Sequence, residues 1–232
     1  MRKFLIDAGH GGSDPGALGK RSHEADINLF ICQLVGKILT EQGQKVVYSR
    51  TSDIFLTLAQ RADISNKNDC DVFISIHCNS FSNPAANGIE TWSYPSSSNG
   101  LKLSKLVQSE LINAVGLSNR GSKTANFGVL RMTEAVAILV ETAFISNLKE
   151  ESLLMQNDFR QKIAESIVKG LFKYMNIPFV EKKVVKESDK KVIAKDGHYY
   201  KIQVGAFSNK SYADAESERL NKLGIKAFVT LV

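Results

Sequence analysis

The stretch Val72-Phe73-Ile74-Ser75-Ile76 decides the fold class, because an apolar run of this length is typical of a buried β-strand. The run ends directly at a polar residue, His77. Two further short apolar runs have the same character, at residues 3–7 and 137–140. The sequence therefore predicts a sheet with strands inside the molecule.

Helical patterns separate these strands. Between residues 27 and 39 apolar side chains recur at steps of three and four, so they share one face of a helix, and Gly43 follows as a stop. Further strands are predicted at residues 45–49 and 89–94, and further helices at 56–66, 103–111 and 163–172. Strands that alternate with helices predict an α/β fold with a single, mostly parallel sheet flanked by helices.

The alternation stops at Pro178, and the rest of the chain has a different character. Residues 181–195 contain six lysines and three acidic residues but no apolar stripe, as expected of a linker. Beyond it, residues 199–204 and 226–231 are strand-like, and residues 211–223 between them are helix-like. We therefore divide the chain into a main domain at 1–178, a linker at 179–196 and a small βαβ segment at 197–232.

The formal net charge of +6 is concentrated in the tail, where residues 181–232 contribute +4 from 11 basic and 7 acidic residues. A basic tail suits an anionic partner such as a wall polymer, a nucleic acid or a membrane surface. Its lysines lack interleaved aromatic residues, so no nucleic-acid partner is expected. No run approaches the roughly 20 apolar residues of a membrane span, and the first apolar run is too short for a secretory signal. We expect synthesis in the cytoplasm without a signal peptide, and no membrane partner.

Polar residues stand where three of the apolar strands end. His10 follows the first strand, His77 follows the stretch quoted above, and Glu141 follows the run at residues 137–140. Ligands of α/β sheets bind beyond the carboxyl ends of the strands, so these side chains are expected to share one edge. Glu24, at the start of the first long helix, can reach the same edge.

Two histidines and one carboxylate form a catalytic zinc set that leaves a fourth position for water, and another carboxylate nearby can act as general base. Taken singly, each residue has a structural alternative: a histidine after a strand is often hydrogen-bonded, and Glu24 suits the positive end of a helix dipole. Two neighbours compete for the metal. His23 adjoins Glu24, whereas Cys78 follows His77 and, in an extended chain, points the opposite way.

Four motifs carry a resemblance to a known family. They are, in chain order, Ile6-Asp7-Ala8-Gly9-His10-Gly11-Gly12 with Asp14-Pro15-Gly16-Ala17, then Glu24-Ala25-Asp26-Ile27-Asn28-Leu29, then Ser75-Ile76-His77-Cys78-Asn79-Ser80, and finally Leu139-Val140-Glu141-Thr142-Ala143-Phe144-Ile145-Ser146-Asn147. Together they resemble the signatures of the amidase-3 family of zinc N-acetylmuramoyl-L-alanine amidases. The resemblance implies a twisted six-stranded sheet, one zinc ion bound by His10, Glu24 and His77, and Glu141 as the catalytic carboxylate.

The same resemblance implies a reaction, hydrolysis of the amide bond between N-acetylmuramic acid and L-alanine in bacterial peptidoglycan. Zinc lowers the pKa of a bound water to about 7. Glu141, its pKa raised by burial, would accept the proton of the water and hand it to the leaving L-alanine nitrogen. Asn79 is a candidate substrate contact near the metal. Arg131 is a candidate partner of a stem-peptide carboxylate or, equally, a member of a surface salt bridge. The alternatives are a zinc peptidase that cuts another bond of the stem, and a non-catalytic wall-binding protein.

The tail carries a second resemblance. Residues 199–209, Tyr-Tyr-Lys-Ile-Gln-Val-Gly-Ala-Phe-Ser-Asn, are similar to the first strand and turn of the sporulation-related repeat, SPOR, whose modules bind glycan strands stripped of peptide. The chain supplies only one of the two halves of such a module. This half is shorter than the roughly 40 residues that usually fold without help. Two chains are therefore expected to pair as a homodimer, or the segment is poorly ordered; a vestigial tail is the third alternative. The missing signal peptide indicates a phage or prophage endolysin, or a sporulation-associated autolysin, that acts on the cell wall after release.

Overall fold

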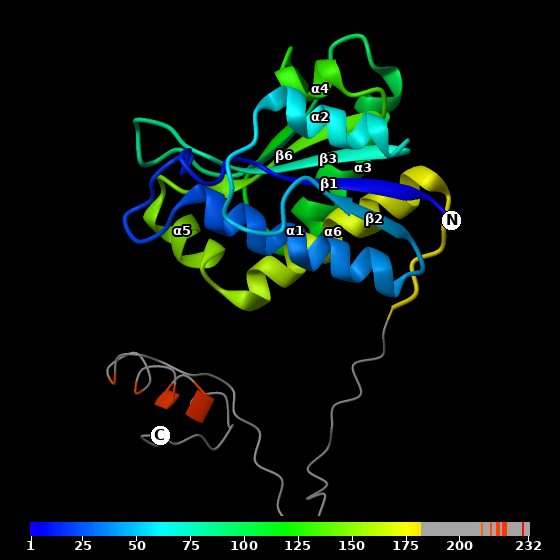
Figure 1. Cartoon of the computed structure of the whole chain (residues 1–232). Helices are drawn as coiled ribbons and strands as arrows, with labels where there is room; N and C mark the ends of the chain where they lie inside the picture. Colours follow the sequence, from blue (N-terminus) through cyan, green and yellow to red (C-terminus); the bar gives the residue numbers. More distant parts are fainter. Residues whose placement is uncertain (182–209, 211–213, 215–216, 219, 222–228, 230–232) are drawn as a thin grey trace, which may run out of the picture. The chain divides into compact units, whose positions relative to one another are not determined.

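The computed structural model describes residues 1–181 and, in the tail, residues 210, 214, 217, 218, 220, 221 and 229 (Figure 1). The chain forms two compact units, Met1–Glu181 and Lys182–Val232. Most of the predicted linker and nearly all of the two strands predicted in the tail lie outside the described residues. The described residues between 214 and 221 are helical, in agreement with the helix predicted there.

The first unit is built on one six-stranded sheet. Its strands are β1 (Lys3–Ala8), β2 (Lys45–Tyr48), β3 (Val72–Asn79), β4 (Ile89–Ser93), β5 (Asn119–Thr124) and β6 (Val136–Phe144). They lie in the order β2-β1-β3-β6-β4-β5, and every neighbouring pair is parallel except β4 with β6. The predicted α/β fold with a mostly parallel, six-stranded sheet is confirmed.

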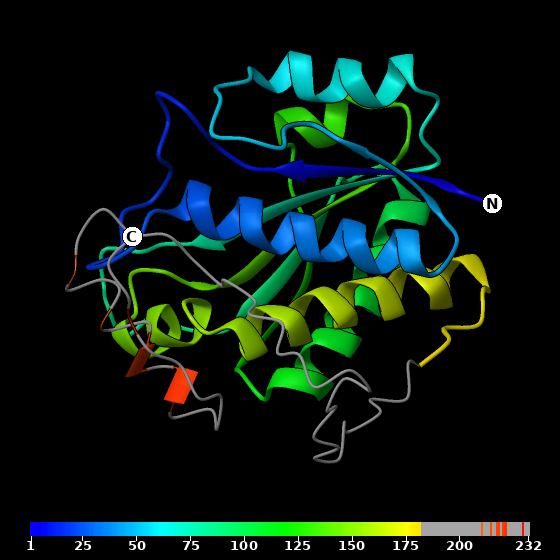
Figure 2. The same ribbon diagram turned by 60° about the horizontal axis from the view of Figure 1, so that its bottom comes forward.

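Helices cover both faces of the sheet. They are α1 (Glu24–Glu41), α2 (Leu58–Lys67), α3 (Ser98–Val115), α4 (Gly128–Met132), α5 (Leu148–Leu154) and α6 (Asn157–Met175). Helices α1, α3 and α6 lie on one face, whereas α2 and α4 lie on the other (Figures 1 and 2). In the described part of the chain, no helix combines the length and the apolar composition that crossing a membrane requires.

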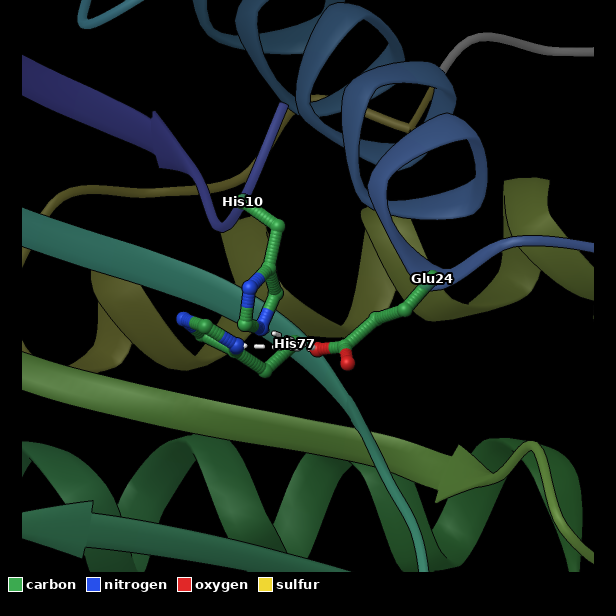
Figure 3. A group of neighbouring side chains, drawn as sticks. All are labelled: His10, Glu24 and His77. Atoms are coloured by element: carbon green, nitrogen blue, oxygen red, sulfur yellow. Dashed lines mark hydrogen bonds and ion pairs between the residues drawn. The ribbon is translucent and has the colours of Figure 1, made fainter. Parts of the chain in front are cut away.

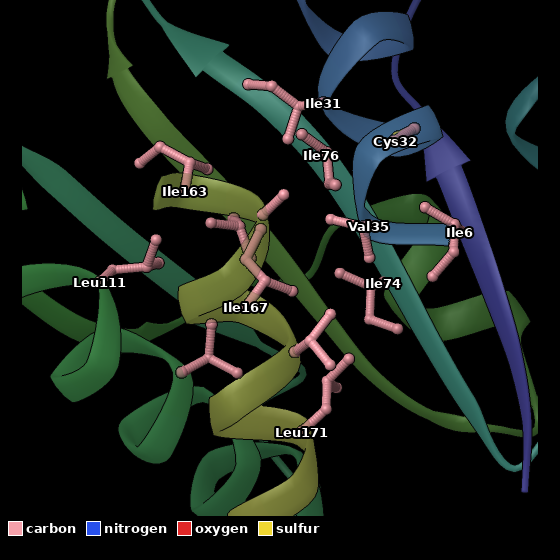
Figure 4. Close-up of a cluster of buried hydrophobic side chains, with 14 of the residues drawn as sticks. Ile6, Ile31, Cys32, Val35, Ile74, Ile76, Leu111, Ile163, Ile167 and Leu171 are labelled. Carbon is pink, nitrogen blue, oxygen red and sulfur yellow. The ribbon is translucent and has the colours of Figure 1, made fainter. Parts of the chain in front are cut away.

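The larger hydrophobic core fills the space between the sheet and helices α1, α3 and α6. Ile74 and Ile76 of β3 face it and meet apolar side chains of α1 and α6 there (Figure 4). A smaller cluster beneath α2 and α4 includes Phe73 of β3 and Leu139 of β6. Successive side chains of a strand point to opposite faces, so His77, which follows Ile76, belongs to the α2/α4 face of the sheet.

Strand β5 and helices α4 and α5 were not predicted, because their sequences lack a periodic apolar pattern. Strand β5 reads Asn-Arg-Gly-Ser-Lys-Thr and pairs with β4 alone at the edge of the sheet. Helices α4 and α5 are too short to show a helical apolar stripe. Each of them forms because the rest of the fold supplies its partners, which is a property of tertiary structure.

The predicted ends of two strands are wrong. His77 and Glu141 lie inside β3 and β6 rather than after them, because parallel pairing continues past both residues and places them opposite each other. Because His77 and Glu141 are paired across neighbouring strands, their side chains lie next to each other on the sheet. Adjacent parallel strands are about 4.8 Å apart.

A buried ion pair ties α2 to the carboxyl end of β1. Nη1 of Arg61 lies 2.8 Å from Oδ1 of Asp7, and both side chains are almost fully buried. The same guanidinium donates through Nη2 to the carbonyl oxygen of His10 at 2.8 Å. The pair therefore fixes the backbone that presents His10.

We expect Arg61→Met to lower the free energy of unfolding by about 3 kcal/mol, because it leaves the Asp7 carboxylate buried without its cation. Lys67→Met is the matched control, since Lys67 pairs with Asp63 at 3.6 Å on the exposed face of the same helix. Exposed pairs contribute at most about 1 kcal/mol. Urea unfolding followed by circular dichroism measures both variants, and equal losses would contradict the assignment.

Candidate metal and catalytic site

The first histidine of the site is held in a tight turn after β1. His10 has a positive φ of 59°, and Nδ1 of its ring lies 2.8 Å from Oδ2 of Asp14. A side chain at Gly9 would bring its Cβ within 2.3 Å of the His77 ring, so only glycine fits there. The turn therefore fixes the ring of His10, leaving Nε2 to face the interior of the site.

Glu24, the first residue of α1, lies at the centre of the group. Its side chain is buried, and Oε1 lies 3.2 Å from Nε2 of His10 and 2.9 Å from Nδ1 of His77. The backbone N–H of Cys78 also donates to Oε1 at 3.1 Å, and that of Ala17 donates to Oε2 at 2.8 Å. These bonds hold the carboxylate between the two imidazoles.

The three side chains come from the turn after β1, the start of α1 and strand β3, and they converge on one point (Figure 3). One ligand atom from each of His10, Glu24 and His77 can be chosen so that all lie within 4.8 Å of one another. The two imidazole rings meet edge to face, with centroids 4.9 Å apart. Two imidazole nitrogens and one carboxylate oxygen match the donor set of a catalytic zinc site. The residues present therefore fit a metal ion.

Electrostatics within the group favour its charged forms. The hydrogen bond to Glu24 raises the pKa of His10 to about 9, against the effect of burial. Burial opposes ionisation of Glu24, but the hydrogen bonds from His10 and His77 outweigh it and hold its pKa well below the usual range. Burial likewise opposes charge on His77, and the bond to Glu24 raises its pKa. The imidazoles and the carboxylate therefore stabilise one another's charged forms.

A second carboxyl group stands beside these three. Glu141 of β6 is the parallel strand partner of His77, and its Oε2 is buried with no hydrogen-bond partner among the described residues. Burial raises the pKa of Glu141 to about 7, the direction that the sequence predicted. Buried polar atoms are nearly always hydrogen-bonded. An unpartnered carboxyl group with a shifted pKa is therefore a functional candidate.

The raised pKa of Glu141 predicts a pH-dependent stability. The unfolded chain releases this proton near pH 4.5, whereas the folded protein keeps it up to about pH 7. Stability therefore falls as the pH rises through this window, by about 3 kcal/mol in total. Glutamine carries no charge, so metal-free Glu141→Gln should be more stable than the wild type at pH 8 and equally stable at pH 4. Urea unfolding with a chelator measures the difference, and a gap independent of pH would overturn the prediction.

The two competing ligands lie apart from the group. Cys78 is buried, with Sγ 3.5 Å from Oδ1 of Asn28 and Oγ1 of Thr142, on the opposite face of β3 from His77. His23 is exposed, and its Nδ1 lies 3.8 Å from Asp26. All three cysteines of the chain are free and buried.

The two candidate substrate residues have partners within the protein. Asn79 donates from Nδ2 to Glu90 at 2.6 Å and accepts the N–H of Ser80 at Oδ1. Arg131 is exposed on α4 and donates to the side chain of Asn126. Direct substrate contacts by Asn79 and Arg131 stay predictions.

Some residues of the site were missed in the sequence. Asp14 orients His10, and Arg61 holds its backbone. Glu90 lies opposite Glu141 in the antiparallel pair of β4 with β6. The only local sign that Glu90 is a site residue was that an acidic residue lies inside a predicted strand. For Asp14, the only local sign was its position four residues after His10. Neither reveals a partner until the register of the sheet is known.

Two histidines and a carboxylate that fit a metal ion, beside a buried carboxyl group at the carboxyl end of a parallel sheet, define the site of a metal-dependent hydrolase. The family described as N-acetylmuramoyl-L-alanine amidase matches residues 4–173, and the SPOR domain matches residues 191–232. The chain belongs to the N-acetylmuramoyl-L-alanine amidase family. The predicted enzyme class, hydrolysis of the peptidoglycan amide bond, is confirmed.

Individual proteins extend the likeness over most of the chain. It is 35% identical to the sporulation-specific N-acetylmuramoyl-L-alanine amidase of Bacillus subtilis, over 100% of this chain and 85% of that protein. It is 36% identical to an endolysin of Bacillus phage SPP1, over 84% of this chain and 78% of the endolysin. The solved catalytic domain of the amidase CwlV from Paenibacillus polymyxa is 36% identical, with a TM-score of 0.73, over 77% of this chain and 100% of that domain.

Proposed function

We propose that the chain is a zinc-dependent amidase in which His10, Glu24 and His77 hold one zinc ion and Glu141 carries the proton. The observation behind this proposal is the convergence of three ligand atoms within 4.8 Å next to the unpartnered carboxyl group of Glu141. When bound, zinc would acidify a water molecule and polarise the amide carbonyl. The substrate class, peptidoglycan, is that of the family.

The residues of the chain transfer the proton and orient the metal ligands. Oε2 of Glu141 takes a proton from the attacking water and passes it to the leaving L-alanine nitrogen. A pKa near 7 suits both steps, because the group then gains and loses a proton at similar cost. Asp14 accepts a hydrogen bond from Nδ1 of His10 and so directs Nε2 toward the ligand group.

Muropeptide analysis of digested cell walls tests the metal and the bond together. We expect release of intact stem peptides with a new N-terminal alanine, loss of this activity with a chelator, and its return on adding zinc. Cleavage within the stem would instead identify a zinc peptidase. Digestion that is indifferent to the chelator would contradict the role of the metal.

For the tail we propose binding to glycan strands stripped of peptide, with two chains pairing their half-modules into a homodimer. The SPOR match over residues 191–232 and the positive charge of this segment support the proposal. Sedimentation equilibrium of the full chain over a hundredfold concentration range should show reversible dimers that pellet with denuded glycan. A monomer at every concentration would argue against pairing.

We further propose sporulation as the setting, with synthesis in the cytoplasm and action on the wall after release. One relative that matches the whole chain, tail included, is named as sporulation-specific. Immunoblots through a sporulation time course should show accumulation before mother-cell lysis. Accumulation only after phage induction would point to an endolysin instead, as the likeness to the SPP1 protein suggests.

A further inference from the structure

A second charged group lies one strand away from Glu141, on the same face of the sheet. Glu90 of β4 is the antiparallel partner of Glu141, and its side chain is buried. Its Oε1 accepts a hydrogen bond from Asn79 at 2.6 Å, and its Oε2 accepts from Nε of Arg120 at 2.9 Å and from Nζ of Lys123 at 2.6 Å. A buried carboxylate therefore holds two cations of the edge strand β5 beside the site.

The charges of this group do not cancel. Among Glu90, Arg120 and Lys123, one carboxylate is paired with two cations, which leaves one net positive charge; the carboxyl group of Glu150, which accepts the N–H groups of Gly88 and Phe144, is a further neighbour of Arg120. The side chains of Arg120 and Lys123 are 38% and 36% exposed. The guanidinium and the ammonium group therefore contact solvent in addition to Glu90. Among the described residues, none accepts a hydrogen bond from Nη2 of Arg120. The Nη2 donor of Arg120 and the partly exposed ammonium group of Lys123 are thus available to an anion from outside.

Aromatic side chains flank the two cations. Nζ of Lys123 lies 5.1 Å from the centre of the Trp92 ring, and Trp92 meets Phe127 edge to face at 5.5 Å. Phe127 is partly exposed at the start of α4. An aromatic wall beside a cation restricts where the cation can move. The position of Lys123 is therefore defined from two sides, by Glu90 and by Trp92.

We propose that Arg120 and Lys123, positioned by Glu90, bind a carboxylate of the peptide stem on the alanine side of the scissile amide. This inference rests on the proposed amidase function. Neighbouring strands lie about 5 Å apart, so cations bound to Glu90 lie on the order of 5–10 Å from Glu141. An extended peptide advances about 3.5 Å per residue. The free carboxylate of the second stem residue therefore falls within reach when the amide lies at Glu141.

Carboxylate recognition is thus assigned to residues of the edge strand β5 rather than to Arg131. Arg131 lies on α4, and its guanidinium donates to Asn126 rather than to a group next to Glu141. By contrast, Arg120 and Lys123 both donate to Oε2 of Glu90. Glu90 is the residue that pairs with Glu141 across β4 and β6. Arg131→Gln is therefore a matched control that removes one cation from the same side of the sheet.

Two soluble muropeptides test the proposal, identical except that the carboxyl group of the second stem residue is free in one and amidated in the other. The wild type should cleave the free acid with a kcat/KM about tenfold higher. Lys123→Met and Arg120→Gln should each remove most of this preference through KM, with the amidated substrate changed less than twofold. Each single variant leaves Glu90 one cation, which protects the fold. Arg131→Gln should keep the preference.

Binding to the Glu141→Gln chain, measured by calorimetry, provides a readout that does not depend on which bond is cut. The free acid should bind about tenfold more tightly than the amidated form, and Lys123→Met should abolish the difference. Equal binding of both muropeptides, or equal losses for both in the variants, would overturn the proposal. Preferential binding of the free acid, together with no release of N-terminal alanine by the wild-type enzyme, would support the carboxylate site and refute the amidase function instead.

Discussion

Replacing Glu141 by glutamine lowers kcat for release of stem peptides by at least about 10³-fold, because one group serves both as proton acceptor and as proton donor. General acid–base catalysis contributes about 10²–10⁴-fold for a single transfer. Glutamine keeps the size of the side chain and cannot accept the proton. Initial rates come from labelling the new N-terminal alanine, and bound zinc is measured by atomic emission on the same samples. Zinc content should be unchanged, because Glu141 lies outside the three-ligand group.

The matched control is Glu165→Gln, a glutamate of α6 whose carboxylate accepts a hydrogen bond from Gln161 of the same helix. Its activity should stay within about twofold of the wild type. Urea unfolding of Glu141→Gln shows independently that the variant is folded. Turnover by Glu141→Gln at the original rate, with zinc bound, would remove Glu141 from the mechanism.

Loss of a ligand is the second large effect. We expect His77→Ala and Glu24→Gln each to raise the zinc dissociation constant at least about 100-fold and to abolish activity at micromolar zinc. Replacing an oriented ligand removes a bond directly, and even outer partners of metal ligands are worth about 10–100-fold in affinity. Competition with a chromophoric chelator measures the constants. His23→Ala should match the wild type, because His23 is exposed and lies apart from the ligand group.

The pH dependence of zinc binding follows from the same group. A metal must displace protons from its ligands, and the pKa of His10 in the metal-free protein is raised to about 9 by Glu24. Zinc affinity should therefore rise with pH between 6 and 9. The rise should be shallower in Glu24→Gln, since the carboxylate that stabilises the imidazolium is absent. An affinity that is flat over this range would show that His10 is not a ligand.

How much the sequence predicts varies along the chain. The helix with its apolar stripe at residues 27–39 was recognised, although α1 extends from Glu24 to Glu41. Buried strands such as β3 were found because their apolar runs are local features. Strand β5 was not, since its polar sequence resembles a loop and only its pairing with β4 makes it a strand.

The site shows the same division. His10, Glu24, His77 and Glu141 could be named in advance, because each lies in a short motif or at the end of an apolar run, and strand direction predicts a common edge. Their assigned roles stay proposals until the variants are measured. Asn79 and Arg131 were also named, but in the structure each forms hydrogen bonds with other residues of the protein that no local pattern reveals.

The α/β class, the family and the candidate ligands therefore follow from the sequence alone, because periodicity and motifs depend only on residues that are close together in the chain. Tertiary structure alone decided that β4 runs antiparallel to β6, and hence that Glu90 lies opposite Glu141 and draws Arg120 and Lys123 to the site. The physical reason is that strand order and register arise from hydrogen bonds between segments distant in the chain. A charged residue acquires its partner, its burial and its pKa only when those segments meet.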